Sequence, residues 1–282
     1  MTHPTPIPAD RYNAHPGINK SAICAARIDD DTISMAHMRA QMTRDHDDNL
    51  DATPAMRWGT LAHAVLLEPV TFAGRIAVWS ETKRGKDWEA FKTAHADKWI
   101  VGRLELDKLD AMRKALQADN TARGLIGRIQ AAEQGFEWTD PLYGLAKAKP
   151  DGCGDNILIE YKTVRSISRR WFQSDAKRRG YHIGAAWYWH GYGEPNQVIF
   201  IVQEKAAPFC CACYDIPAGV LTPAYDEAAK IAAQYRICCG LDEGRGVFSG
   251  PYQGLQTFEL PQWGGGDVET DVSTGTMEGG DL

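Results

Sequence analysis

The sequence predicts one α/β domain in which a mixed central β-sheet is flanked by α-helices. Residues 143–163 form two strand-like runs around turn residues, first Pro150-Asp151-Gly152 and then Gly154-Asp155-Asn156. The apolar run 197–204 predicts a buried strand, and 209–216 predicts a second strand that pairs with it. Stretches with helix start and stop signals lie on either side of these strands, as expected when helices cover a sheet.

The remaining elements follow from local signals. Residues 1–20 are rich in Pro, His and Asn, and we expect a flexible N-terminal arm there. Thr53 suits the N-cap of a helix and Pro54 its first position, so a helix is expected over residues 53–68, where Pro69 stops it. Further expected elements are a short helix from 19–23, a strand over 71–79, a polar helix over 87–96, one long or two consecutive helices over 104–132 with Gly124 and Gly127 as weak points, a strand over 133–138, a helix over 169–190 capped by Ser168, and a helix over 222–239.

These elements define the expected domain limits. Residues 21–262 are expected to make the folded domain, because the strand and helix signals lie between these limits. Residues 263–282 are Gly-rich and acidic without apolar periodicity, which predicts a disordered tail.

Composition narrows the class of protein. The chain has 282 residues, of which 44% are hydrophobic and 24% charged, as in an ordinary globular protein. A net charge of -6 argues against a surface that is basic throughout, but it leaves room for a local basic lining that binds an anionic partner. The chain has no membrane-length apolar run and no signal-peptide core, so we expect a cytoplasmic protein without membrane association. The seven cysteines include no CxxC pair and are expected to be reduced and mostly buried.

A group of charged residues accompanies the predicted strand 157–163. Strand alternation places Leu158, Glu160 and Lys162 on one face, and Asp151 can fold back beside them. Two neighbouring carboxylates repel each other unless a cation lies between them, and their hard oxygens suit Mg²⁺ or Mn²⁺. A lysine in this place can orient a water molecule for attack on phosphorus. An exposed Glu-Lys pair on a hairpin is the alternative interpretation of the motif taken alone.

Pro150-Asp151 followed by Glu160-Tyr161-Lys162 resembles the PD-(D/E)XK nuclease signature, with the apolar run Ile157-Leu158-Ile159 before it. Three further stretches resemble the RecE-type exonucleases of phages and prophages (exonuclease VIII), within the RecB-like group. They are Gly59–Pro69, Glu133–Pro141 and Gly180–Tyr188. Together the similar stretches cover most of residues 15–205, and the resemblance implies the PD-(D/E)XK nuclease fold.

The resemblance also implies roles for individual residues. Asp151 and Glu160 would hold the metal with the Tyr161 carbonyl, and Lys162 would position the attacking water. A lone histidine on a helix is usually a core residue, but Gly59-x-x-x-His63 resembles the motif whose histidine lies beside the metal. The early acidic residue of the group matches Glu133 best, with Glu137 as the competing choice. The catalytic set is therefore Asp151, Glu160 and Lys162, and the metal set is His63, Glu133, Asp151, Glu160 and Tyr161.

DNA contacts are expected on the C-terminal side of this strand. The loop residue Arg165 can contact a phosphate. The densest basic run of the sequence, Lys177-Arg178-Arg179, can hold the DNA backbone without reading its sequence. The RecB-like group has a glutamine in the following helix where this chain has Gly184, so His182 or a backbone contact is expected to substitute for it. The residues expected to bind DNA are Arg165, Lys177, Arg178, Arg179, Tyr181 and Tyr188.

Lysines and a short segment near the predicted strands have more open roles. Lys147 and Lys149 are expected to counter carboxylate charge or to contact phosphate, with solvent exposure as the alternative. The segment Gly17–Ser21 resembles one that opens the nuclease domain of RecE-type proteins, and a structural role is expected for it.

The resemblance implies a Mg²⁺-dependent deoxyribonuclease, with Mn²⁺ as a second candidate metal. The expected activity is 5′ to 3′ digestion of linear double-stranded DNA from its ends, in the cytoplasm of a bacterial host. Such digestion leaves 3′ overhangs for recombination through a single-strand annealing partner. Family members form rings around DNA, so a homo-oligomer is expected.

Two alternatives use the same fold. A PD-(D/E)XK endonuclease would share the site but cut circular DNA. A non-catalytic DNA-binding protein on a decayed nuclease fold is favoured by Gly184. The joint presence of Asp151, Glu160, Lys162 and His63 argues against such decay.

Overall fold

A computed structural model describes residues 4–28, 32–44, 53–241, 248 and 250–251 of the chain. All of these residues belong to one compact unit, Met1–Pro251. A second unit, Tyr252–Leu282, lies outside the described residues, and so does the expected tail over 263–282.

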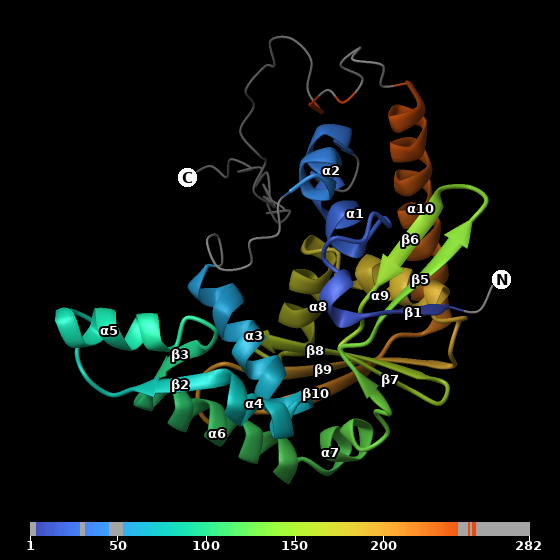
Figure 1. Ribbon diagram of the computed structural model, residues 1–282. Helices are drawn as coiled ribbons and strands as arrows, with labels where there is room; N and C mark the ends of the chain where they lie inside the picture. The colour runs from blue at the N-terminus through green and yellow to red at the C-terminus, as the bar shows by residue number, and fades with distance from the viewer. Residues whose placement is uncertain (1–3, 29–31, 45–52, 242–247, 249, 252–282) are drawn as a thin grey trace, which may run out of the picture. The chain divides into compact units, whose positions relative to one another are not determined.

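The unit is built on a five-stranded mixed sheet (Figure 1). Its strand order is β10-β9-β8-β7-β4, in which β8 and β9 are parallel and the other pairs are antiparallel. The strands are β4 (Ala131–Ala132), β7 (Gly152–Gly154), β8 (Ile157–Val164), β9 (Gln197–Glu204) and β10 (Cys211–Asp215). The predicted fold class, a mixed α/β sheet flanked by helices, is confirmed.

Each face of β8 packs into its own hydrophobic core, as the alternation of its side chains predicts. Leu158 lies in a core with residues of α9 (Tyr181–Gly191) and α10 (Ala218–Leu241). Ile159 and Tyr161 lie in a second core with residues of α3 (Pro54–Leu67) and α6 (Arg103–Ala118). The sheet is therefore a layer between two sets of helices, and β8 is held rigidly at its centre.

The strand that pairs with β8 is not the one expected from the sequence. The run 143–149 forms β6 (Gly144–Ala148), which pairs with β5 (Gly135–Asp140) in a separate three-stranded sheet. The antiparallel partner of β8 is the short strand β7, joined to it through a turn in which Asn156 has a φ of 58°. The tight turn thus lies at 155–156, where Asn tolerates a left-handed backbone, rather than at Pro150.

The N-terminal segment also differs from expectation. Of the residues expected to form a flexible arm, β1 (Thr5–Ile7) pairs with β5, and Ile7 is buried. A 3-10 turn, η1 (Ala9–Arg11), and then α1 (Lys20–Ala26) follow. Buried Lys147 fixes the intervening loop, because its ammonium donates to the carbonyls of Tyr12 and His15 at 2.7 and 2.8 Å. Lys147 is therefore a structural anchor. Its ammonium binds backbone carbonyl groups rather than a carboxylate, and the side chain is buried rather than exposed to solvent.

This anchor gives a testable expectation. Lys147→Met leaves the loop carbonyls without their donor, and unsatisfied buried acceptors cost about 1–3 kcal/mol. We expect urea unfolding to show a loss of this order and limited proteolysis to cut faster within residues 4–17. Unchanged unfolding and unchanged proteolysis would contradict the anchoring role.

The helices on either side of the sheet follow the sequence signals in part. Thr53 caps α3 by accepting from the Met56 amide at 3.2 Å, and Pro54 is its first residue. Pro69 follows the end of α3 and is also the first residue of α4 (Pro69–Arg75). Residues 71–75 of the expected strand over 71–79 are therefore helical. The remaining elements are α2 (Met35–Met42), α4 (Pro69–Arg75), β2 (Ile76–Trp79), α5 (Lys86–Ala94), β3 (Trp99–Gly102), α7 (Asn120–Ile126) and α8 (Arg169–Arg178).

Two expected long helices are each divided into two. The stretch 104–132 forms two consecutive helices, one of the two expected arrangements. They meet at Asp119, whose side chain caps α7, and α7 ends at Ile126 with Gly127 as its C-cap, whereas Gly124 lies within the helix. The stretch 169–190 breaks at Gly180, where a φ of 66° requires glycine. No helix among the described residues has both the length and the apolar character needed to cross a membrane. All seven cysteines have free thiols, but Cys210 and Cys239 are exposed, so burial is less general than expected.

Candidate active site

The site lies where the two sheets separate. Ala132 pairs with Gly152 and Phe136 pairs with Ala148, so the register is the same on both sides of the break. The segments 133–134 and 149–151 cross between the sheets at this point. Glu133 therefore lies opposite Asp151, and its amide donates to the Asp151 carbonyl at 3.2 Å. Its φ of 51° turns the chain out of the ladder.

Three side chains converge there from distant parts of the chain. His63, on α3, has its Nδ1 at 3.4 Å from Asp151 Oδ1 and at 3.7 Å from Glu133 Oε1. The ligand-type atoms of these three residues all lie within 4.8 Å of one another. An imidazole nitrogen and two carboxylate oxygens at this spacing can hold a divalent metal ion. Of the two candidates for the early acidic residue, Glu133 is the one that belongs to this group. Glu137 instead pairs with His15 at 2.5 Å.

Glu160 and Lys162 lie directly beside the group of three. Lys162 Nζ donates to Glu160 Oε2 at 2.8 Å and lies 3.4 Å from Asp151 Oδ2. It is also 3.2 Å from the Tyr161 carbonyl, which therefore faces the site as expected. The backbone of β8 fixes the Asp151 side chain, because Asp151 Oδ2 accepts a hydrogen bond from the Tyr161 amide at 2.6 Å. The Glu160 carboxylate is turned toward Lys162 and lies outside the convergent group of His63, Glu133 and Asp151.

The charges of these groups stabilise one another. Burial alone would raise the pKa of Asp151, but Lys162 and His63 outweigh it and hold that pKa well below its usual range. Burial would lower the pKa of Lys162, but Asp151 and Glu160 outweigh it and raise that pKa. Burial also opposes protonation of His63, yet Asp151 and then Glu133 raise the pKa of His63 to about 9. In the metal-free protein at neutral pH, His63 is therefore an imidazolium.

A metal ion that binds His63 must displace this proton, because only the neutral imidazole is a ligand. We expect Mn²⁺ binding to release about one proton from His63 at pH 7 and to tighten as the pH rises toward about 9. Calorimetry at pH 7 in two buffers with different ionisation enthalpies measures this release. A binding heat that is the same in both buffers would contradict it.

Two further lysines complete the site. Lys149 Nζ pairs with Glu133 Oε2 at 3.0 Å, so it counters carboxylate charge as one of its expected roles. Lys20, the first residue of α1, places its Nζ 3.0 Å from Glu160 Oε2. Sequence reasoning expected only a structural role for the segment 17–21, and nothing in the local sequence around Lys20 indicates its distant partner.

The expected DNA contacts are in different surroundings. Arg165 is exposed just after β8, and Tyr181 has its ring 5.8 Å from Lys162 Nζ. Tyr188 is only 4% exposed and lies beneath Lys20 Nζ, 4.4 Å from the ring centroid, so a direct DNA contact by Tyr188 is wrong. The exposed guanidinium groups of Arg178 and Arg179 both pair with Asp175 on the same helix, which reduces the positive charge of the basic run.

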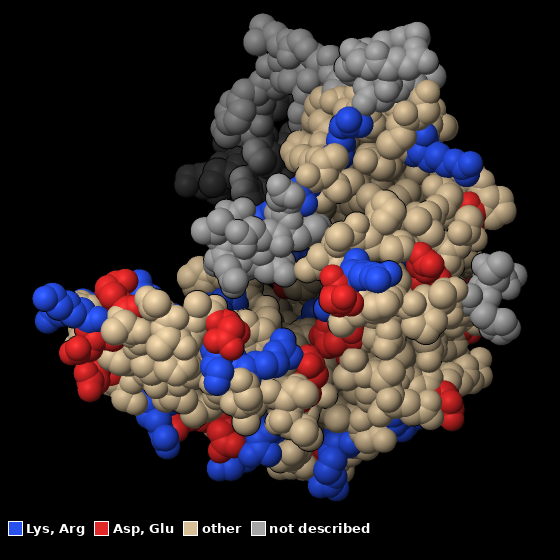
Figure 2. Space-filling view, in the orientation of Figure 1, with Lys and Arg blue, Asp and Glu red and all other residues tan. Residues whose placement is uncertain are grey.

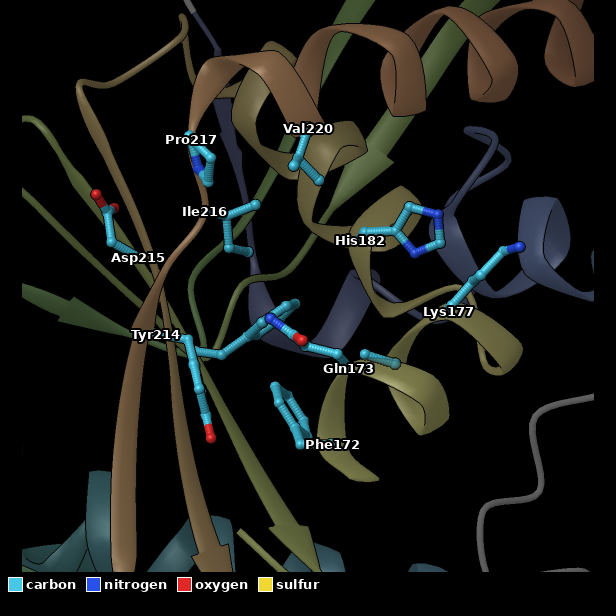
Figure 3. Close-up of a pocket in the computed structure, with 11 residues that line it drawn as sticks. Phe172, Gln173, Lys177, His182, Tyr214, Asp215, Ile216, Pro217 and Val220 are labelled. Atoms are coloured by element: carbon cyan, nitrogen blue, oxygen red, sulfur yellow. The ribbon is translucent and has the colours of Figure 1, made fainter. Parts of the chain in front are cut away.

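The missing glutamine is not replaced by His182. A side-chain carbon added at Gly184 would lie 3.1 Å from Lys20 Cδ, so the Lys20 stem occupies the space beside Gly184. His182 instead lines a cavity of about 400 Å³ together with Lys177 and Phe172, between α8, α9 and β10 (Figure 3).

On the face of the molecule in Figure 2, acidic and basic side chains are interspersed. This face is therefore not basic throughout.

Comparison with known proteins agrees with this fold. The structure resembles the crystal structure of a candidate exonuclease from Eubacterium rectale, with a TM-score of 0.57 and 10% sequence identity. The match covers 89% of this chain and 96% of the other, and at this identity it shows the fold alone. The curated proteins include no match.

The fold and the site define a protein of the PD-(D/E)XK nuclease superfamily. Residues 27–243 match the family model described as "PDDEXK-like domain of unknown function (DUF3799)", and the chain belongs to that family. The superfamily suggests nuclease activity, and the group of His63, Glu133 and Asp151 is consistent with the divalent metal that such nucleases use.

Proposed function

We propose that this protein is a Mg²⁺-dependent deoxyribonuclease that hydrolyses linear double-stranded DNA. The observation that carries the proposal is the convergence of His63, Glu133 and Asp151 beside Glu160 and Lys162. A bound divalent ion would polarise the phosphoryl oxygen and stabilise the leaving oxygen, and Mg²⁺ or Mn²⁺ suits the carboxylate oxygens.

The protein's own groups supply the rest of the mechanism. His63, Glu133 and Asp151 hold the ion, and Glu160 and the Tyr161 carbonyl complete its surroundings. Lys162 donates a hydrogen bond to the attacking water and stabilises the negative charge that develops on it. Its ammonium is in place for this, because Asp151 and Glu160 anchor it at 3.4 and 2.8 Å. Arg165, which follows β8, and Tyr181, whose ring centroid lies 5.8 Å from Lys162 Nζ, bind the DNA backbone.

The finer proposal is a RecE-type exonuclease that digests the 5′-ended strand and leaves 3′ overhangs. Support comes from the sequence stretches shared with that group and from the fold likeness to a candidate exonuclease. In this proposal the protein acts in the bacterial cytoplasm as a homo-oligomeric ring on DNA ends, and an annealing protein receives the single strand.

The test uses linear duplex DNA labelled at one 5′ end, with closed circular DNA and the Lys162→Ala protein as controls. We expect Mg²⁺-dependent loss of the label from linear DNA only, and only with the wild-type protein. Cleavage of circular DNA would replace the exonuclease by an endonuclease. Equal inactivity of wild type and variant with Mg²⁺ and with Mn²⁺ would overturn the enzymatic function.

A further inference from the structure

Lys20 is a second lysine on the Glu160 carboxylate, and it comes from α1 rather than from β8, which carries Glu160 and Lys162. Its Nζ donates to Glu160 Oε2 at 3.0 Å, the same oxygen that accepts from Lys162 at 2.8 Å. Lys162 has two further acceptors close by, Asp151 Oδ2 and the Tyr161 carbonyl. Glu160 Oε2 thus accepts from two lysines, and the contact from Lys20 can be lost more easily than the contact from Lys162.

The fold holds Lys20 in this place with several independent contacts. Asn19 caps α1 by accepting from the Ala22 amide at 2.9 Å, which fixes Lys20 as the first helical residue. Ile18 is joined to β6 on both sides, through its amide to Leu145 and through its carbonyl to Lys147. The Lys20 stem then runs past Gly184, and its Nζ lies over the Tyr188 ring, 4.4 Å from the centroid. A surface lysine without a role needs no such support.

Exposure distinguishes the two lysines. The side chain of Lys20 is 30% exposed, against 16% for Lys162 and 3% for Glu160. The Lys20 side chain is thus paired with a buried carboxylate while part of it remains exposed to solvent.

The balance of charge indicates what that ligand is. Three ammonium groups, of Lys20, Lys149 and Lys162, already pair with the carboxylates of Glu160, Glu133 and Asp151. A divalent ion adds positive charge to these residues even after the His63 proton has left, and it would compete with the lysines for Glu160. Both effects favour an anion beside Lys20, and a backbone phosphate is the anion that a DNA substrate brings.

We propose that Lys20 is a DNA-binding residue, which is paired with Glu160 in the metal-free protein and contacts a backbone phosphate of the substrate when the divalent ion is bound. The inference rests on the proposed nuclease function and adds a substrate-binding residue to it. Lys20 supplies a charge that fixes the position of the phosphodiester chain relative to Lys162.

The test is the salt dependence of DNA binding by the Lys20→Met protein, measured by fluorescence anisotropy. The probe is a short duplex with phosphorothioate linkages, which resists hydrolysis, in Ca²⁺ and separately in EDTA. One lost phosphate contact lowers the slope of log K against log salt by about 0.9, and it weakens binding roughly tenfold near 0.1 M salt. We expect this loss in Ca²⁺ and a smaller loss in EDTA, where Lys20 remains on Glu160.

Matched variants identify the cause. Lys230→Met, which removes an exposed lysine from α10, should keep the wild-type slope, and Lys20→Arg should restore most of the binding. Lys20→Gln keeps a donor for Glu160 and carries the same test if Lys20→Met does not fold. A wild-type slope for both neutral variants, in a protein that still cleaves DNA, would overturn the role of Lys20. Equal losses in Ca²⁺ and EDTA would overturn its link to the metal. A wild-type protein that neither binds nor cleaves DNA would instead refute the nuclease function.

Discussion

Lys162→Ala is expected to lower the rate of DNA cleavage roughly 10²- to 10³-fold, the range typical for removal of one donor that stabilises developing negative charge. Lys162 Nζ lies within 3.4 Å of Asp151, Glu160 and the Tyr161 carbonyl, so alanine leaves the water unoriented and the charge on it unopposed. Single-turnover cleavage of labelled linear duplex at saturating Mg²⁺ measures the loss without a contribution from product release.

Lys114→Ala is the matched control for this variant. Lys114 is 70% exposed and pairs with Asp110 on the outer side of α6, so its removal should leave cleavage near the wild-type rate. The variant Lys162→Ala should still bind Mn²⁺, because His63, Glu133 and Asp151 remain. Cleavage by Lys162→Ala at the rate of the Lys114→Ala protein would contradict the assigned role of Lys162.

Asp151→Asn is expected to weaken metal binding by more than about 100-fold and to abolish cleavage. Loss of outer-shell partners of a metal typically costs 10- to 100-fold in affinity, and loss of a ligand should cost more. Asn still accepts from the Tyr161 amide, which Asp151 binds at 2.6 Å, so the local backbone has a partner. It removes the charge that His63 and Lys162 face, at 3.4 Å in each case. Calorimetric titration with Mn²⁺ measures the affinity.

Asp155→Asn provides the comparison, since Asp155 is exposed in the turn between β7 and β8, four residues from Asp151. It should bind Mn²⁺ as the wild type does. Equal affinities for the Asp151→Asn protein and the wild type would show that the ion binds elsewhere. Circular dichroism of both variants separates a loss of the metal ligand from a loss of the fold.

Signals carried by local sequence predicted the parts of the site on β8 and α3. The alternation of Ile157–Thr163 gave the two faces of β8, and Thr53-Pro54 marked the start of α3, which positions His63. These features depend on strand geometry and helix capping, and both act over a few residues. Their prediction from sequence therefore needs no tertiary information.

Features that depend on distant pairing were missed. The strand β7 is Gly-Cys-Gly and has no β-branched or aromatic residue, so the strand-like run 143–149 before it was taken as the partner of β8. The approach of Glu133 to Asp151 depends on the shared register of β4 with β7 and of β5 with β6. No local pattern fixes that register, and the choice of Glu133 over Glu137 came from the family resemblance.

Charged residues were the least predictable, because their partners decide what they do. Lys147 was expected near carboxylates or phosphate and is instead buried on carbonyl groups of the N-terminal loop. The run Lys177–Arg179 was expected to be a free basic cluster, but Asp175 on the same helix pairs with both arginines. Lys20 was given no site role and lies 3.0 Å from Glu160.

Anomalous diffraction from crystals grown with Mn²⁺ can locate the bound metal ion. We expect an anomalous peak at coordination distance from His63, Glu133 and Asp151, with Lys162 beside it and not among the ligands. A peak at other residues, or no peak in crystals of protein that cleaves DNA in Mn²⁺, would contradict this expectation.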